Sequence, residues 1–355
     1  MTIGGPSFEG LRGARTLEEP RGCGTRGRPN ATFTFDLVSA VDADRLLGGA
    51  RRPLVLGIGG GGDVVGALAT AEHARLDHGA SPIVGGVSWE RRPIDPLPGP
   101  RTVSEIEDAR QLAACVLAAR TETRVRDGGV RFAESRMAEL LGQETVLVDP
   151  TPGPAAIADG LATAADALGA DLLVFVDVGG DVLAHGGEPG LASPLCDAVM
   201  LAAAGRLQAD GRAVLGGVFG PGCDGELTLA ELDARFAEIA AAGGLAGARG
   251  IGPGVADLLE RAVSAIPTEA SAQALLAFRG ARGPTAIRSG RRTLQLSPVA
   301  AMTVYFDVAV AIGSAARLAA AVDGAGSLAE ANETLHSLGL RTELDYELGA
   351  AADER

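Results

Sequence analysis

Residues 53–63 read Pro-Leu-Val-Leu-Gly-Ile-Gly-Gly-Gly-Gly-Asp, an apolar strand that leads into a glycine-rich turn and then into a helix-like segment. Three of these glycines have the G-x-G-x-x-G spacing, which lets a phosphate approach the backbone amides without meeting a Cβ atom. Asp63 stands where the helix begins, the position that a pyrophosphate normally takes, so a cation or a sugar hydroxyl would have to lie between them. The stretch predicts a nucleotide or sugar-phosphate site that departs from the plain NAD fingerprint. Its predicted ligand-binding residues are Gly57, Gly59, Gly60, Gly61, Gly62 and Asp63.

The composition favours a globular protein that binds small molecules. The chain has 355 residues, 46% of them hydrophobic, so it can bury a large core. A formal net charge of −14 argues against a general nucleic-acid surface, and 3% aromatic residues leave few platforms for stacking bases. The four cysteines show no C-x-x-C spacing, which fits a reducing cytoplasm and implies neither a disulfide nor a structural zinc.

The hydropathy pattern contains no secretory leader and no apolar run of the length that spans a membrane. We therefore expect a cytoplasmic protein without a membrane partner. Whether it forms oligomers is left open by the sequence.

The alternation of short apolar runs with Ala- and Leu-rich segments predicts an α/β fold, Rossmann-like, with a mostly parallel sheet flanked by helices on both faces. We expect residues 1–30 to be a flexible N-terminal extension, because they have almost no periodic apolar pattern. Residues 31–347 should form a single domain, followed by a flexible tail over 348–355. The predicted core strands are 54–58, 83–88, 145–148, 172–176 and 213–219.

Acidic residues and glycines follow these predicted strands repeatedly. Since the carboxyl ends of parallel strands meet at one edge of a sheet, residues from different strand ends should converge there. A single Asp at such a position often caps the next helix, so helix capping is the alternative for each of them. The carboxylates expected to converge are Asp63, Asp177, Asp181, Asp224 and Glu226.

Asp177 and Asp181 flank a Gly-Gly pair, which lets both carboxylates turn toward one bound group. They could bind Mg²⁺ beside a phosphate or accept hydrogen bonds from a ribose diol. His185 follows in a polar loop and is a candidate acid–base group, with a solvated side chain as the alternative. Together with Asp224 these three residues are the predicted catalytic residues, and Asp177 with Asp181 the predicted metal ligands.

The loop over residues 220–226 again combines glycine with carboxylates, and we assign Glu226 to the ligand site with the glycine loop. Ser193 and Asp197 fit a helix N-terminus, where an anion or hydroxyl contact competes with simple capping. A cluster of arginines in an otherwise acidic chain could receive a phosphate or be a solvated surface. These arginines are Arg279, Arg282, Arg288, Arg291 and Arg292.

Five motifs together resemble a family of archaeal and bacterial proteins catalogued as a domain of unknown function, the eleven-fifty-two family. They lie at residues 57–64, 177–183, 193–198, 220–226 and 297–307, and the similarity spans roughly Phe33 to Glu347. The resemblance implies a Rossmann-like fold and no established activity. The glycine loop alone also resembles the deoxyhypusine-synthase and sirtuin type of NAD-binding fold, in which chemistry occurs at the ribose carbon attached to nicotinamide.

Three functions remain as hypotheses. The leading one is a hydrolase or transferase acting on a nucleotide, nucleoside or phosphorylated sugar at the glycosidic carbon, because nearby carboxylates stabilise a cationic sugar-like transition state. The second is an NAD(P)-dependent oxidoreductase or transferase. The third is a nucleotide-binding sensor without chemistry. Mg²⁺ and NAD(P) are the corresponding cofactor hypotheses.

Overall fold

The computed structural model describes residues 41–353, which form one compact unit. Its centre is a nine-stranded sheet in the order β10-β13-β9-β8-β1-β2-β7-β5-β4, and two two-stranded sheets, β11-β12 and β3-β6, lie outside it. The strands are β1 (Pro53–Gly57), β2 (Ile83–Val87), β3 (Ile106–Glu107), β4 (Arg110–Ala113), β5 (Val116–Ala119), β6 (Arg124–Val125), β7 (Thr145–Val148), β8 (Leu172–Val178), β9 (Val214–Phe219), β10 (Leu245–Gly250), β11 (Gly283–Ile287), β12 (Arg292–Leu296) and β13 (Met302–Phe306).

The five predicted core strands are confirmed as β1, β2, β7, β8 and β9, and they pair in parallel. Along the sheet they follow the order β7-β2-β1-β8-β9, which in order of occurrence is 3-2-1-4-5. This is the usual order of doubly wound nucleotide-binding folds, in which the chain runs outward from the first strand to the third and then crosses back to the other side of the first. The switch point, where a ligand crevice opens, therefore lies between the carboxyl ends of β1 and β8.

Four antiparallel strands extend the sheet beyond what the sequence predicted. β5 and β4 add to the edge at β7, while β13 and β10 add to the edge at β9. Two of them, β4 and β10, are largely exposed or partly buried and pair with a register shift, which explains why no continuous apolar run revealed them. Between β2 and the next helix the chain forms an irregular loop and the four short strands β3 to β6.

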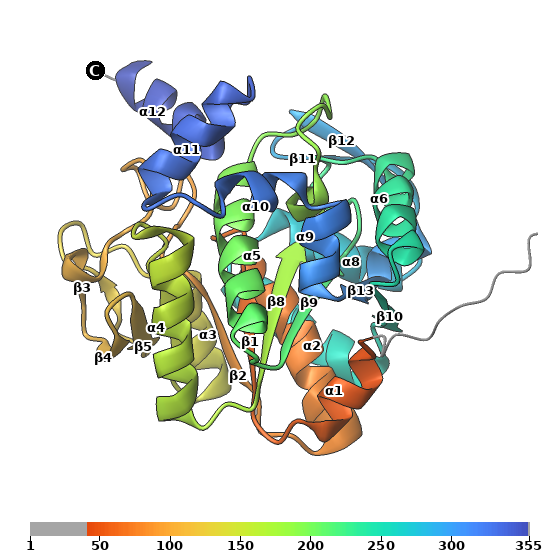
Figure 1. The fold of residues 1–355 in the computed structure, drawn as a ribbon, viewed down its shortest axis with the longest axis horizontal. Helices are drawn as coiled ribbons and strands as arrows, with labels where there is room; N and C mark the ends of the chain where they lie inside the picture. The colour runs from red at the N-terminus through yellow and green to blue at the C-terminus, as the bar shows by residue number, and fades with distance from the viewer. Residues whose placement is uncertain (1–40, 354–355) are drawn as a thin grey trace, which may run out of the picture. The chain divides into compact units, whose positions relative to one another are not determined.

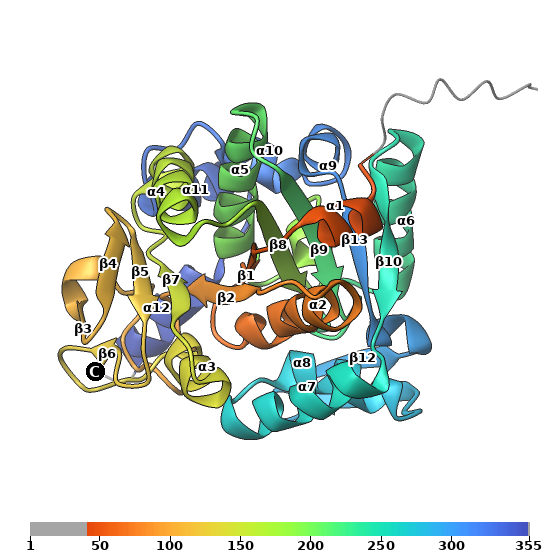
Figure 2. The same ribbon diagram turned by 90° about the horizontal axis from the view of Figure 1, so that it is seen from below.

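Helices cover both faces of the sheet, as Figure 2 shows, which confirms the α/β Rossmann-like arrangement. One face packs against α4, α5 and α9 to α11, and the other against α1 to α3, α7 and α8. The helices are α1 (Ala43–Gly49), α2 (Asp63–His78), α3 (Ala133–Leu141), α4 (Gly153–Leu168), α5 (Pro194–Ala209), α6 (Leu229–Ala241), α7 (Pro253–Ala265), α8 (Glu269–Phe278), α9 (Val308–Ser314), α10 (Arg317–Val322), α11 (Leu328–Ser337) and α12 (Glu343–Asp353), with short 3₁₀ turns η1 (Val103–Glu105), η2 (Asp181–Leu183) and η3 (Pro298–Ala301).

Local sequence signals account for several helix ends. Thr228 and Glu231 form a capping box at the start of α6, and the Ser327 side chain accepts a hydrogen bond from the Glu330 amide at the start of α11. Thr102 and Glu105 form another capping box at the start of the 3₁₀ turn η1.

Of the two predicted domain boundaries, only the C-terminal one can be compared with the described residues. The expected N-terminal extension, residues 1–30, lies outside them. At the other end, α12 continues to Asp353, so the predicted boundary at 347 falls inside a helix. None of the helices in the part of the chain that the structure describes is long and apolar enough to cross a membrane.

Candidate functional site

Buried carboxyl groups gather at the carboxyl ends of β1, β8 and β9. In Figure 1 the β8 arrow points to the end of the molecule where the β11–β12 hairpin and α12 lie. Six carboxyl-bearing residues supply oxygens here, in two groups of three, and within each group the oxygens lie within 4.8 Å of one another. The first group is Asp63, Asp177 and Asp197, and the second is Asp181, Asp224 and Glu226. The two groups are called the inner and the outer carboxyl group below.

The inner carboxyl group joins the glycine loop to β8 and α5. Asp177 and Asp197 are each 1% exposed, and Asp63 is the most exposed of the three when the whole residue is counted. The amide of Gly59 donates to Asp63 Oδ2 at 2.9 Å, which holds that carboxylate at the N-terminus of α2. The sequence placed Asp63 at a helix start. In the structure this position lies beside Asp177 and Asp197.

The outer carboxyl group joins η2 to the loop after β9. Glu226 is well satisfied: it accepts hydrogen bonds from the Ala192 and Ser193 amides at 2.6 and 2.9 Å and from Ser193 Oγ at 2.6 Å. Asp224 differs, because neither of its carboxylate oxygens has a hydrogen-bond partner among the described residues. Glu226 thus positions the loop, and Asp224 presents its oxygens to the site.

The lack of water and of donors raises the pKa of most of these acids. Burial raises the pKa of Asp63 and of Asp224 to about 7. For Asp177, Asp181 and Asp197, burial followed by the charges of neighbouring acids holds the pKa well above its ordinary value. The neighbours that act on Asp177 and Asp181 belong to both groups, so the two groups form one electrostatic unit.

The glycine loop has two roles that the sequence pattern did not separate. A Cβ atom on Gly57 or Gly62 would collide with the start of α2 or with Thr268, so these glycines permit close packing. A Cβ atom on Gly59 would lie 2.6 Å from Asp63 Oδ2 and 3.1 and 3.2 Å from the Asp197 oxygens, so this glycine borders the inner carboxyl group.

Gly60 and Gly61 have positive φ angles of 81° and 56° and form the tip of the loop. Within residues 41–353 the amides of Gly60 and Gly62 donate to no protein acceptor. They are the two loop amides left to hold a ligand oxygen.

His185 takes part in an ion-pair network with α6 and in neither carboxyl group. Its Nε2 lies 2.8 Å from Arg235 Nη1 and 3.0 Å from Glu238 Oε2. Burial and then the charge of Arg235 lower the pKa of His185, which favours a neutral ring that accepts a hydrogen bond from Arg235. The structure therefore gives this histidine a partner other than the acids that the sequence grouped with it.

Arg91 links the glycine loop to the C-terminal helix. Its Nη2 donates to the Gly59 carbonyl at 2.5 Å and lies 3.4 Å from Glu343 Oε1, and its guanidinium stacks 4.3 Å from the centroid of the Trp89 ring. Glu343 also accepts the amides of Leu195 and Cys196 at 3.0 and 2.9 Å, so it caps the N-terminus of α5. The first turn of α5, which carries Asp197, is thereby held against α12.

Two buried acids, one in the inner carboxyl group and one near it, were not grouped with the others from the sequence. Asp197 was interpreted as part of a helix start, and its place in the first turn of α5, the helix that follows β8, was the signal that could have assigned it. Glu134, on α3, is 1% exposed and neither of its oxygens has a partner in the described part of the chain. Burial, followed by the charge of Glu90, holds its pKa well above the ordinary value, and Asp63 adds to this effect. No local pattern could have revealed Glu134, because it lies against Gly86 of β2 and within electrostatic range of Asp63, both far from it in sequence.

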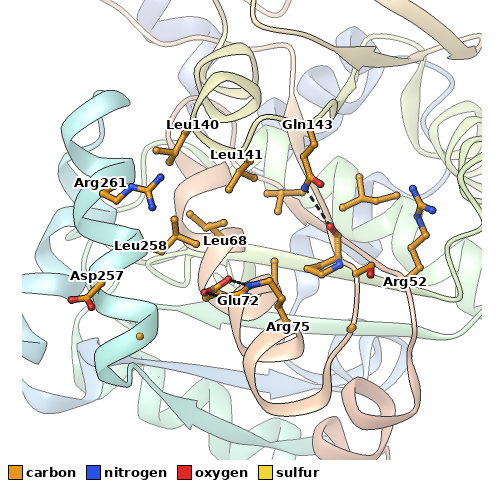
Figure 3. Close-up of a pocket in the computed structure, with 17 residues that line it drawn as sticks. Arg52, Leu68, Glu72, Arg75, Leu140, Leu141, Gln143, Asp257, Leu258 and Arg261 are labelled. Atoms are coloured by element: carbon orange, nitrogen blue, oxygen red, sulfur yellow. Dashed lines mark hydrogen bonds and ion pairs between the residues drawn. The ribbon is translucent and has the colours of Figure 1, made fainter.

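A separate cavity of about 690 Å³ lies at the opposite edge of the sheet, where β2 begins. Figure 3 shows Leu68, Leu140, Leu141 and Leu258 around it, from α2, α3 and α7, with Arg52 and Arg261 at its margin. It contains none of the carboxyl groups described above. Because ligands of this fold class bind at the carboxyl ends of the strands, the cavity is not the candidate site.

A family model for proteins of unknown function, DUF1152, matches residues 54–351. The chain belongs to this family. Comparison with curated proteins and with solved structures found no match. The likeness of the glycine loop to the deoxyhypusine-synthase and sirtuin type of fold stays a prediction.

The raised pKa values predict how the free energy of unfolding of the metal-free protein changes with pH. A carboxyl group whose pKa is higher in the folded than in the unfolded protein stabilises the fold fully below the unfolded pKa, and this contribution is lost as the pH rises through the folded pKa. For Asp63 and Asp224 that window extends from about 4 to about 7. Each group should remove roughly 1.4 kcal/mol of stability per pH unit within it. Denaturant unfolding of the metal-free protein in EDTA should show stability falling from pH 5 to pH 7, and a constant stability would contradict the burial of these acids.

Proposed function

We propose that this protein is a divalent-cation-dependent hydrolase or transferase that acts on a phosphorylated sugar or a nucleotide. The observation that carries the proposal is a set of buried carboxylate oxygens at the switch point that have no partner among residues 41–353: Asp177 Oδ1, Asp197 Oδ1 and both oxygens of Asp224. Leaving a buried polar atom unpaired costs about 1–3 kcal/mol, and more for a charged one, so such a set is unfavourable unless a ligand satisfies it.

The donor set fits a hard divalent cation. Mg²⁺ prefers oxygen ligands, and it is usually held by one or two carboxylates together with substrate phosphates and water. The inner carboxyl group offers three such carboxylates, and Gly59 of the glycine loop borders two of them. A cation held by Asp63, Asp177 and Asp197 would neutralise the charge that otherwise repels a phosphate from this helix N-terminus. It would supply Lewis-acid polarisation of a phosphate or leaving-group oxygen.

The protein's own groups would bind and move protons around that centre. The loop amides of Gly60 and Gly62 would orient a ligand oxygen. Asp224, with both oxygens unpartnered and a pKa raised by burial to about 7, suits the general acid or base, because efficient proton transfer needs a pKa near the working pH. This assignment moves the proton-transfer role from His185, which is occupied by Arg235 and Glu238, to Asp224.

A second candidate function is an NAD(P)-dependent reaction, and the 3-2-1-4-5 strand order favours it. The carboxylate of Asp63 at the N-terminus of α2 argues against it, because it occupies the position of a dinucleotide pyrophosphate. Titration of the protein with NADH, followed by nicotinamide fluorescence, separates the two candidates. NADH binding in excess EDTA would favour the dinucleotide reaction. No NADH binding, together with binding of a divalent cation, would favour the cation-dependent hydrolase or transferase.

Asp177→Asn tests the cation site. Replacing one of three carboxylate ligands should weaken Mg²⁺ or Mn²⁺ binding at least about tenfold in titration calorimetry. Because the substitution also removes a desolvated ionisable group, the metal-free variant should be at least as resistant to thermal unfolding at pH 8 as the wild type. Asp233→Asn, an exposed position on α6, is the matched control and should leave the affinity unchanged. Equal affinity in Asp177→Asn would overturn the assignment.

Gly59→Ala tests how closely the glycine loop approaches the acids. The added methyl would force the carboxylates of Asp63 and Asp197 apart, so cation affinity should fall about tenfold or more while the fold is retained. Gly187→Ala is the control, since a Cβ atom there meets nothing within 4 Å. Circular dichroism verifies folding and Mn²⁺ titration measures the affinity. A variant that binds Mn²⁺ as tightly as the wild type would show that the loop does not border the cation.

A further inference from the structure

The β11–β12 hairpin brings positive charge to the outer carboxyl group from outside the main sheet. Arg292 Nη1 lies 3.0 Å from Glu226 Oε1 and 3.4 Å from the Asp224 carbonyl oxygen. Arg288 Nη2 lies 3.8 Å from the same Glu226 oxygen. Two of the five arginines that cluster in the sequence therefore belong to the site, which their spacing alone did not show.

The two arginines differ in how firmly they are held. The side chain of Arg292 is 16% exposed and makes the closer ion pair, so it is largely occupied with Glu226. The Arg288 side chain is 42% exposed, and its ion pair is long. Its backbone, by contrast, is anchored, because the Arg288 amide donates to Glu269 of α8 and Gly290 closes the turn onto the Ile287 carbonyl at 3.1 Å. Arg288 thus combines a fixed attachment point with a guanidinium that is free to change partner.

The charge of Arg288 reaches both carboxyl groups. It opposes the effect of burial on the pKa of Asp63 in the inner group and of Asp224 in the outer group. Arg288 is therefore within electrostatic range of the whole site, and its fork of N–H donors matches the geometry of phosphate oxygens.

We propose that Arg288 binds the phosphate group of the substrate, on the side of the site opposite the cation, and that Arg292 positions Glu226. This inference rests on the proposed function and names its substrate class, a phosphate ester or diphosphate. Acids alone repel such a group. A cation held by the inner carboxyl group on one side and a guanidinium from the hairpin on the other together provide the positive charge that it needs.

The experiment is calorimetric titration of the Mg²⁺-loaded protein with inorganic pyrophosphate. Arg288→Ala should weaken pyrophosphate binding roughly tenfold or more, since a charged hydrogen-bond donor to the anion is lost. Arg288→Lys keeps the charge but loses the forked pair of N–H donors. Its pyrophosphate affinity should therefore lie between those of Arg288→Ala and the wild type. Arg279→Ala is the matched control, because that arginine pairs with Glu260 on the surface and should leave binding unchanged. Mg²⁺ affinity, titrated separately, should be no weaker in any of the three variants than in the wild type, because loss of a nearby positive charge cannot disfavour a cation.

The outcomes separate this inference from the proposed function. Equal pyrophosphate affinity in the wild type and Arg288→Ala, with Mg²⁺ bound to both, would overturn the role of Arg288 and leave the cation site standing. A wild type that binds no Mg²⁺ would overturn the proposed function. In that case, the wild type could still bind pyrophosphate in EDTA. If Arg288→Ala then failed to bind it, the role of Arg288 in phosphate binding would be supported without the cation.

Discussion

Removal of carboxyl groups from water is the constraint on which the rest of this structure depends. Six acids meet at the carboxyl ends of β1, β8 and β9, and three of them, Asp177, Asp197 and Asp224, have carboxylate oxygens without a hydrogen-bond partner among residues 41–353. Transfer of an ionised carboxylate into a protein interior is costly, so the group binds a proton, a cation or a donor. A fold that concentrates these groups at its switch point is destabilised there, and such local destabilisation is typical of sites that gain their missing partners from a ligand.

The surrounding elements hold the acids in place without neutralising them. Glu226 is satisfied by two amides, a hydroxyl and Arg292, and it fixes the loop that carries Asp224. Glu343 accepts two amides at the N-terminus of α5 and so fixes the helix turn that carries Asp197. Both of these glutamates have donors, whereas among the described residues both oxygens of Asp224 and Oδ1 of Asp197 have none. The supporting glutamates are thus satisfied, while the aspartates that they position keep unpartnered oxygens.

The arginines near the site contact the supporting acids and backbone carbonyls rather than the unpartnered aspartate oxygens. Arg91 reaches the site from the loop after β2 and is shared between the Gly59 carbonyl and the acids of α12. Arg288 and Arg292 reach it from a hairpin that lies outside the main sheet. None of these three arginines places its guanidinium within hydrogen-bond distance of Asp177 Oδ1 or of the two Asp224 carboxylate oxygens. These oxygens have no partner among the described residues and are available to a cation or a proton.

The sequence by itself determined the five parallel strands, the glycine loop and the presence of acids after several strands. These features follow from local patterns, since a buried strand is a continuous apolar run and a tight turn needs glycine. It also placed Asp63, Asp177, Asp181, Asp224 and Glu226 at one edge, because parallel strands deliver their carboxyl ends together. Only the tertiary structure decided the strand order, the addition of Asp197 and Glu134, the pairing of His185 with α6 and the approach of Arg288. Each of these depends on contacts between segments far apart in the chain, and the energy of burying a charge is set by those contacts rather than by neighbours in sequence.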